Sequence, residues 1–373
     1  MSKSGSDGHN QTSSNAGAYT LTEILSQPLS WSTSLKQLRQ SGLLEQIKTR
    51  FAHAEEWIFI GCGSSYYVAQ SAAATMAELS GKRAHALPAS EILLYPEIAL
   101  AGRKQYVPVL ISRSGKTSEV LKAAEALKAR GIATIGISCA TGQPLEKRVT
   151  QAIVLPAADE QSTVMTRSFS TMLIALQALA ATVAAKPEFL NALDQMIGPG
   201  ERLSSSLPTR VNAFVEHYSF EDYVCLAQGP LFGIASEVAL KLTEMSVSYG
   251  QVFHTLEFRH GPKSIVSDKT LIMFLLSEKS YRAEVEVLEE IKKLGGRTLV
   301  VANQADERAR AAADLLVEVQ ADGPELAHLA LYPMAGQLTG LYTGLRKGHD
   351  PDRPRNLSRV VVLEEETSEH AAI

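Results

Sequence analysis

One order of elements recurs along this chain and limits its fold: apolar strand, hydroxyl-rich turn, helix, glycine, strand. It is clearest in "YVPVLISRSGKTSEVLKAAEALKARGIATIGIS", residues 106–138, where two serines, a glycine and a threonine separate the strand from the helix. The earlier segment "EEWIFIGCGSSYYVAQSAAATMAEL" begins in the same way. Strands that alternate with helices predict parallel βαβ layers and therefore an α/β fold.

The same plan returns in the second half of the chain. "DYVCLAQGPLFGIASEVALKLTEM" parallels the first strand, turn and helix, and "TLIMFLLSEKSYRAEVEVLEEIKKLGGRTLVVAN" parallels the second. We expect a tandem duplication, in which each half is a mostly parallel sheet with helices on both faces, a flavodoxin-like three-layer sandwich. A single larger α/β domain is the alternative. The seam is expected in "IGPGERLSSSLPTR", which is rich in Gly, Pro and Ser.

Composition indicates which cellular compartment and which binding partners to expect. A net charge of −4 gives no support for nucleic acid or an anionic membrane as a partner. The three cysteines are widely spaced and odd in number, which favours a reducing compartment and offers no disulfide frame or metal site. No apolar run is long enough to span a bilayer, and the polar start lacks a secretory h-region. We expect a cytoplasmic protein that begins with a disordered tail, residues 1–18.

Two neighbouring turns carry hydroxyl groups that suit an anion. A helix N-terminus offers unpaired N–H groups and a partial positive charge, and a glycine lets the backbone approach a phosphate closely. The carboxyl end of a parallel sheet is also where such folds bind ligands. Helix capping is the plainer interpretation of each turn alone, but two such turns in one half favour phosphate. The candidate ligands are Ser64, Ser65, Ser112, Ser114 and Thr117.

"GCGSSY" also begins like a dinucleotide-binding G-x-G-x-x-G motif. Position 66 is Tyr, however, and no acidic residue follows at the distance where a ribose would be bound. A Walker A loop is absent from the sequence as well. The phosphate is therefore expected on a small metabolite.

A helix of the second half brings ionisable groups together. In "ASEVALKLTEMSV", Glu237, Lys241 and Glu244 are spaced by four and three residues, so they share one face. A solvated salt-bridged face is the usual interpretation, but the apolar neighbours predict burial, where a carboxylate needs a partner or a task. His260 follows in "LEFRHGPKS", and histidine is the side chain best suited to proton transfer near neutral pH.

These segments together resemble the SIS (sugar isomerase) phosphosugar family. "GCGSSY", "ISRSGKTSE", "ASEVALKLTE", "EFRHGPKS" and "DPDRPRNLSRVVV" occur in that family's order over roughly residues 20–365. "EFRHGPKS" and "VMTRSFSTM" are most similar to galactosamine-6-phosphate deaminase/isomerase, and "DPDRPRNL" to the isomerase half of glucosamine-6-phosphate synthase. The resemblance implies SIS domains at residues 19–200 and 201–345, and a tail, residues 346–373, over the active site.

The resemblance also implies a role for each matching residue. Glu244 would move a proton between C1 and C2, with Lys241 beside it as a further catalytic residue. His260 would assist ring opening, reaching across the interface of a homodimer with shared active sites. The rest of the implied substrate- and phosphate-binding set is Ser64, Ser65, Ser112, Arg113, Ser114, Thr117, Thr163, Met165, Thr166, Glu237 and Arg359.

The chain departs from the synthase pattern in two ways. The first 20 residues contain no Cys, so a glutaminase domain with a catalytic cysteine at its start is not expected. Arg359 stands where the synthase has a lysine that forms an imine with the ketose. A guanidinium stays protonated and is a poor imine former.

We therefore expect an isomerase/deaminase for an amino-sugar phosphate of the galactosamine- or glucosamine-6-phosphate type. It would work without a metal or cofactor, by proton transfer between C1 and C2 and release of ammonia. Simple aldose–ketose isomerisation and deglycation of a fructosamine phosphate are alternatives with the same site. A non-catalytic phosphosugar sensor is the alternative of another class, but a sensor would not require Glu244 and His260.

Overall fold

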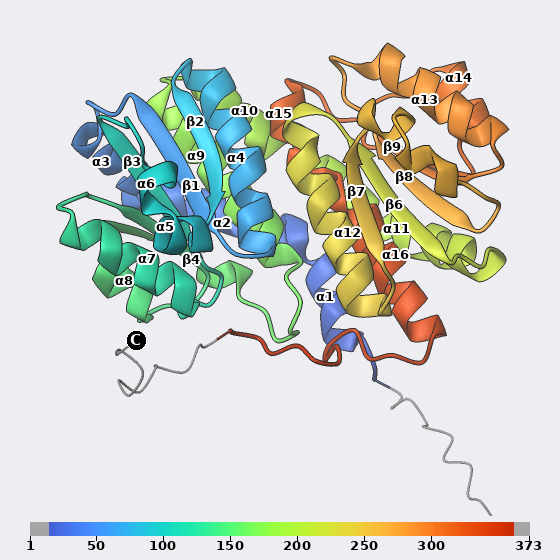
Figure 1. Cartoon of the computed structure of the whole chain (residues 1–373), viewed down its shortest axis with the longest axis horizontal. Helices are drawn as coiled ribbons and strands as arrows, with labels where there is room; N and C mark the ends of the chain where they lie inside the picture. Colours follow the sequence, from blue (N-terminus) through green and yellow to red (C-terminus); the bar gives the residue numbers. More distant parts are fainter. Residues whose placement is uncertain (1–14, 362–373) are drawn as a thin grey trace, which may run out of the picture.

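Two five-stranded sheets stand side by side in the computed structural model, which describes residues 15–361 (Figure 1). Neighbouring strands are parallel throughout, and both sheets have the same strand order, β2-β1-β3-β4-β5 in the first and β7-β6-β8-β9-β10 in the second. The predicted α/β class and the duplication are confirmed. The strands are β1 Glu56–Gly61, β2 Arg83–Pro88, β3 Tyr106–Ile111, β4 Ile135–Ser138, β5 Gln151–Val154, β6 Asp222–Ala227, β7 Gly250–His254, β8 Thr270–Leu275, β9 Arg297–Ala302 and β10 Leu315–Glu318.

Each sheet is covered on both faces because its inner strands are apolar throughout. All of β1 is buried, and its side chains alternate between two cores. Trp57 and Phe59 point into a central core shared by both halves, while Ile58 and Ile60 point into an outer core of the first half. Strand β6 repeats the pattern, with Val224 in the outer core of the second half. Burial on both faces is the expected environment of parallel strands.

The helices fill the central layer and the two outer layers. In Figure 1, α4 of the first half and α12 of the second lie next to each other between the sheets, and they are in direct contact. None of the helices in residues 15–361 is both long and apolar enough to cross a membrane. The α-helices are α1 Ala18–Leu25, α2 Gln27–Ser41, α3 Leu43–Arg50, α4 Ser64–Ser80, α5 Ala89–Leu94, α6 Pro96–Ala99, α7 Ser118–Ala129, α8 Pro144–Arg148, α9 Arg167–Val183, α10 Pro187–Gln195, α11 Ile197–His217, α12 Phe232–Ser246, α13 Tyr281–Lys293, α14 Glu307–Ala312, α15 Glu325–His328 and α16 Pro333–Arg346.

The expected seam contains no loop. The segment "IGPGERLSSSLPTR" forms the first two-thirds of α11, so the boundary expected at residues 200 and 201 falls inside a helix. Pro199 is tolerated because it lies in the first turn, where backbone N–H groups have no helical partner. Gly200 packs against the Trp31 ring, which leaves no room for a Cβ. The Gly, Pro and Ser content suggested a seam here, but Gly200 is small because it packs closely against Trp31.

The two ends of the described chain are joined to each other. Of the tail expected over residues 1–18, residues 1–14 lie outside the described part. The Gly17 N–H donates to Asp350 Oδ1 at 3.0 Å, and the Thr20 N–H donates to Asp352 Oδ1 at 2.7 Å. Both carboxylates thus sit at the N-terminus of α1, where the helix dipole stabilises negative charge. From this anchor the C-terminal segment crosses the base of the molecule towards the first half (Figure 1).

Helix α12 is held tightly by α16 through a line of glycines. Gly336, Gly340 and Gly344 recur every four residues and face α12. A Cβ on Gly340 would lie 2.9 Å from the carbonyl oxygen of Lys241, and one on Gly344 would overlap the carbonyl oxygen of Met245. The backbones of the two helices can approach this closely only because the side chains are missing.

We predict that Gly344→Ala destabilises the protein by about 1–3 kcal/mol, because the new methyl group must displace the backbone of α12. Gly198→Ala in α11 is the matched control, since a Cβ there meets only the tip of Arg202 at 3.9 Å. It should leave stability unchanged or raise it by up to about 1 kcal/mol. Urea unfolding followed by circular dichroism measures both, and equal effects would contradict the close approach.

Candidate active site

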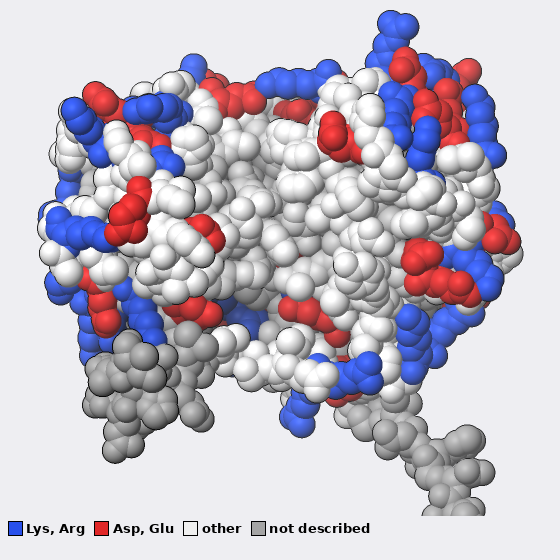
Figure 2. Space-filling view, in the orientation of Figure 1, with Lys and Arg blue, Asp and Glu red and all other residues white. Residues whose placement is uncertain are grey.

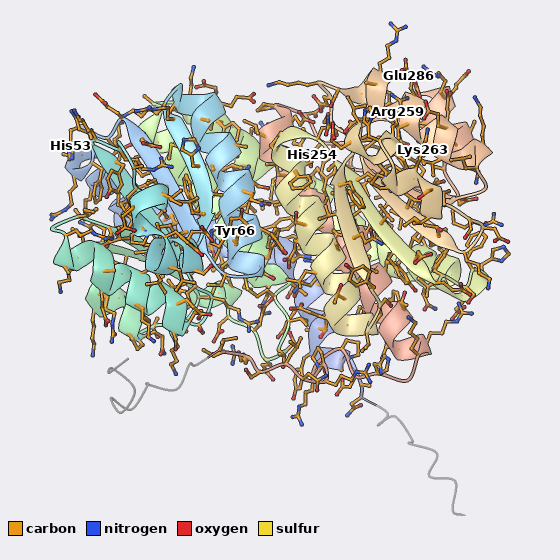
Figure 3. The ribbon with its side chains drawn as sticks, in the orientation of Figure 1. His53, Tyr66, His254, Arg259, Lys263 and Glu286 are labelled. Atoms are coloured by element: carbon orange, nitrogen blue, oxygen red, sulfur yellow. The ribbon has the colours of Figure 1, made fainter. Side chains whose placement is uncertain are left out.

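A pocket of about 240 Å³ opens at the carboxyl ends of β1 and β3. These neighbouring strands lie where the strand order of the first sheet reverses, the place where open α/β sheets bind ligands. Tyr66 follows one of the turns that line the pocket, and its position in Figure 3 shows that the pocket lies near the middle of the molecule. Turns of the first half, α12 of the second half and the tail all line it: Cys62, Gly63, Ser64, Ser65, Arg113, Ser114, Thr117, Thr163, Met165, Leu240, Glu244, Ser358, Arg359, Val360 and Val361.

The turn after β3 is shaped as an anion cradle. Gly115 adopts a left-handed conformation with φ +63°, which reverses the chain before α7 begins. The Ser112 and Thr117 hydroxyls lie 2.9 Å apart across the turn, and the Lys116 N–H donates to Ser114 Oγ at 3.1 Å. The N-termini of α4 and α7 both start at the pocket, so their dipoles favour an anion there.

A buried ion cluster on α12 forms the opposite wall. The Lys241 side chain is fully buried, and its Nζ lies 3.4 Å from Glu237 Oε1 and forms an ion pair with Glu244 Oε2. The same Nζ donates to Ser64 Oγ at 3.3 Å, across the contact between the two halves. The predicted shared face of these residues is confirmed. Only Glu244 of the three lines the pocket, with its side chain 18% exposed.

The cluster shifts the pKa values of its buried members in different ways. Burial raises the pKa of Glu237 to about 8, although Lys241 opposes the shift. Burial alone would lower the pKa of Lys241, but Glu237 and Glu244 outweigh it and keep that pKa above its usual range. The ammonium is therefore retained at neutral pH, and Glu237 is the group that holds a proton.

The C-terminal tail closes one side of the pocket. Ser358 to Val361 line it, and the Val361 carbonyl accepts from the Ser118 N–H at 3.3 Å, at the start of α7. The Arg359 guanidinium donates to Asp159 Oδ1 at 2.6 Å. Arg359 thus stands at the pocket rim, with its charge paired to a carboxylate of the first half.

Arg113 belongs to the cradle by sequence, but its guanidinium serves the surrounding loops. Nη1 donates to Glu160 Oε2 at 3.2 Å and to the Val164 carbonyl at 3.0 Å. Nη2 donates to the carbonyls of Thr163 at 2.8 Å and Arg359 at 3.0 Å. Its side chain is only 6% exposed.

Other predicted residues lie behind the lining or away from it. Thr166 is buried, and both its N–H and its hydroxyl donate to Glu160 Oε1, at 2.7 and 2.9 Å. His260 is exposed and follows a 3₁₀ turn, Glu257–Arg259, that does not line this pocket. Its neighbours Arg259 and Lys263 appear in Figure 3 on the outer part of the second half, apart from Tyr66.

A comparison with family models matches the SIS domain twice, over residues 50–182 and 223–335. The chain belongs to the SIS domain family. The two matched segments coincide with the two sheets, and the pocket lies in the first, while its Glu244 wall comes from the second.

Proteins similar to this chain include enzymes that are named for a sugar phosphate. The chain is 28% identical to a glutamine–fructose-6-phosphate aminotransferase of Chlamydia caviae, and the match covers 93% of the chain but 58% of that relative. It thus spans little more than half the length of the curated relatives it matches.

Solved structures cover the chain more evenly. A glucosamine-6-phosphate deaminase from Thermotoga maritima is 28% identical, with a TM-score of 0.76, covering 92% of this chain and 100% of that one. A tagatose-6-phosphate ketose/aldose isomerase from Escherichia coli is 22% identical with a TM-score of 0.81, covering 94% and 98%, which supports the fold.

The sequence did not point to two buried carboxylates that hold the loops around the pocket. Glu160 is fully buried and, besides Arg113 and Thr166, accepts from the Ser168 N–H at 3.1 Å at the start of α9. Glu23 of α1 is also buried and accepts from the Gln161 N–H at 2.5 Å. Burial and the nearby Glu160 raise the pKa of Glu23. Neither position belongs to a motif, and only the fold brings them under the pocket.

We predict that Glu237→Gln raises stability at pH 8 by roughly 1–3 kcal/mol and leaves it unchanged at pH 5. Folded Glu237 has a pKa of about 8 against a normal 4.5, so the folded chain holds a proton that the unfolded chain loses. Wild-type stability should therefore fall as pH rises through that range, and the amide removes this dependence. Urea unfolding at both pH values tests it, with exposed Glu188→Gln as the control. Parallel curves for wild type and Glu237→Gln would contradict the assignment.

Proposed function

We propose that this SIS protein is a phosphosugar isomerase that deaminates an amino-sugar phosphate. Support comes from its family, from the glucosamine-6-phosphate deaminase that it resembles over 92% of its length, and from the pocket. The single observation that carries the proposal is the position of Glu244. Its carboxylate lines the same 240 Å³ pocket as the hydroxyls of Ser65, Ser114 and Thr117. A phosphate at one end and a base at the other suit a short phosphorylated sugar.

The proposed reaction begins with the open-chain aldose. Glu244 takes the proton from C2 while the C1 oxygen takes a proton from solvent, which gives an enolamine. Glu244 then returns its proton to C1 while the nitrogen loses a proton to solvent, so the product is a C2 imine with a hydroxymethyl group at C1. Water adds to the imine carbon and ammonia leaves, so one amino-sugar phosphate and one water give one ketose phosphate and one ammonia. Proton transfer of this kind needs an oriented carboxylate, and the adjacent Lys241 ammonium orients it.

Arg359 favours proton transfer over a covalent imine. Its guanidinium lies at the pocket rim but is paired with Asp159 at 2.6 Å. An imine requires an unprotonated amine, which a guanidinium does not provide near neutral pH. The other nearby amine, Lys241, is buried between carboxylates that keep it charged. Aldose–ketose isomerisation would use the same site with a hydroxyl at C2, and the absence of ammonia would identify it.

We predict that purified protein releases ammonia from glucosamine or galactosamine 6-phosphate, and that Glu244→Gln lowers kcat at least about 10³-fold. The amide keeps the size of the side chain but accepts no proton. A coupled ammonia assay and a chemical assay for ketose phosphate should fall together. Glu286→Gln, on α13 in the outer part of the second half (Figure 3), is the control and should keep full activity. An active Glu244→Gln enzyme would remove the base from the mechanism.

The proposal includes a homodimer in which His260 completes the site of the partner subunit. His260 is exposed and lies outside the pocket of its own chain. Charged side chains gather at the ends of the face in Figure 2, while its middle, over α4 and α12, is largely uncharged. Leu94, Ile98 and Tyr249 are large apolar residues that are at least 71% exposed. Exposed apolar surface of this kind marks protein–protein contacts.

We predict that mixing inactive Glu244→Gln with His260→Ala restores activity. If His260 acts across the interface, each mixed dimer contains one site with both native residues, and about a quarter of wild-type activity returns after refolding together. Light scattering should give a dimer mass for each variant. A dimer without restored activity would contradict a role of His260 in the partner's site, and a monomer would remove the shared site.

A further inference from the structure

Arg113 contacts three segments that are far apart in the sequence. Its backbone lies in the cradle between Ser112 and Ser114, and the Arg113 carbonyl accepts from the Cys139 N–H at 2.8 Å. Its guanidinium donates to the 160–164 loop and, through Nη2, to the Arg359 carbonyl of the tail at 3.0 Å. A single residue therefore joins the cradle, through its backbone, to the pocket wall and the segment that covers the pocket, through its side chain.

The tail is attached at two separate places. The first is the Asp350 and Asp352 anchor on α1, where the Asp352 carbonyl also accepts from the N–H of the pocket residue Thr163 at 3.0 Å. The second is the segment Ser358–Val361, held by Arg113 and by the Arg359–Asp159 and Val361–Ser118 contacts. The chain is exposed from Arg355 to Arg359, and Asn356, between the two attachments, adopts φ +63°. The second attachment can open while the first stays closed.

We propose that Arg113 is a positioning residue that holds the segment 358–361 over the pocket and couples its closure to the cradle. The inference rests on the proposed function only for the identity of the pocket's occupant, a sugar phosphate. An arginine suits this role because its planar fork serves several acceptors at once and keeps its charge when buried. Glu160, 3.2 Å from Nη1 and fully buried, supplies the counter-charge that fixes the fork.

This role replaces the one expected from sequence, in which Arg113 binds the phosphate. Both terminal nitrogens already donate to protein acceptors, two for each nitrogen. Turning the guanidinium towards a phosphate would leave Glu160 as a buried carboxylate without its counter-ion, which is strongly unfavourable. The two roles differ in what happens to the tail when Arg113 is changed.

Two trypsin cleavage sites in the tail allow closure of the tail to be measured. Trypsin cleaves after Arg355 and Arg359 but not after Arg353, which precedes proline. Arg355 and Arg359 are both exposed, but Arg359 is held by hydrogen bonds of its side chain and of its carbonyl. The rate of cleavage after Arg359 relative to Arg355, from the initial phase of digestion by mass spectrometry, therefore measures opening of the second attachment without any substrate.

The test compares wild type, Arg113→Gln and Arg113→Lys in that digestion, with Arg359→Lys as a matched control that keeps the cleavage site. We expect relative cleavage after residue 359 to rise roughly tenfold or more in Arg113→Gln, the effect of losing one charge-assisted hydrogen bond. Arg113→Lys keeps the charge but not the fork and should be intermediate. It also serves if Arg113→Gln does not fold. Arg359→Lys keeps the carbonyl contact and should change the ratio less than Arg113→Gln.

Phosphate binding distinguishes an Arg113 that positions the tail from an Arg113 that binds the phosphate. Inorganic phosphate should raise the melting temperature of wild type and Arg113→Gln equally if Arg113 only positions the tail, and kcat should fall more than KM rises. Unchanged tail cleavage in both Arg113 variants would overturn the proposal, as would loss of the phosphate effect with the tail still protected. If wild type itself shows no response to phosphate or sugar phosphates, the proposed function fails, and the cleavage ratio still decides the role of Arg113.

Discussion

The site depends on one costly arrangement, a lysine ammonium that is completely removed from water. A buried charge is tolerated only when it is paired and hydrogen-bonded, and Lys241 is paired with Glu244 and has the Glu237 carboxyl group and the Ser64 hydroxyl beside it. Those partners come from both halves of the molecule, so the cluster fixes how α12 lies against α4. The glycines of α16 complete the burial by letting that helix approach the backbone of α12. The position of Glu244 at the pocket follows from packing that extends far beyond the pocket.

The duplicated fold explains why only one half carries the cradle. In the second half, the turn after β8 also ends in hydroxyls, but a side chain of α13 occupies it. Glu284 is fully buried and accepts from the Ser277 N–H at 2.7 Å and the Ser277 hydroxyl at 3.0 Å. Burial raises its pKa to about 7, against the effect of those hydrogen bonds. An internal carboxylate thus satisfies the donors that, in the first half, remain at a pocket.

The sequence predicted what depends on local pattern. Apolar runs located the inner strands, but the half-buried edge strands β2, β7 and β10 were not predicted because they have no long continuous apolar run. The hydroxyl turns follow inner strands, whose carboxyl ends parallel pairing brings to one edge. Helical spacing put Lys241 between Glu237 and Glu244. Residues 197–210, expected as the seam, lie between the two matched SIS segments but are helical, and Gly200 is small because it packs against Trp31 rather than because it forms a turn. The sequence also could not show where the Arg113 side chain points, because Glu160 and the tail contact it only in the folded structure. Glu23, from the first helix, lies outside every motif for the same reason.

The distribution of charge at the pocket has a chemical consequence. Three cations that line the pocket or contact its lining are already paired, Lys241 with Glu244, Arg113 with Glu160, and Arg359 with Asp159. The proposed anion would therefore rely on the hydroxyls of the cradle and on the N-termini of α4 and α7. A free cation beside the phosphate would also attract the carboxylate of Glu244 and compete for the base. Binding by dipoles avoids that competition, because hydroxyls and helix termini carry no mobile charge that could reach across the pocket. The same pairing explains how a pocket in a chain of net charge −4 can hold an anion and a carboxylate base close to each other.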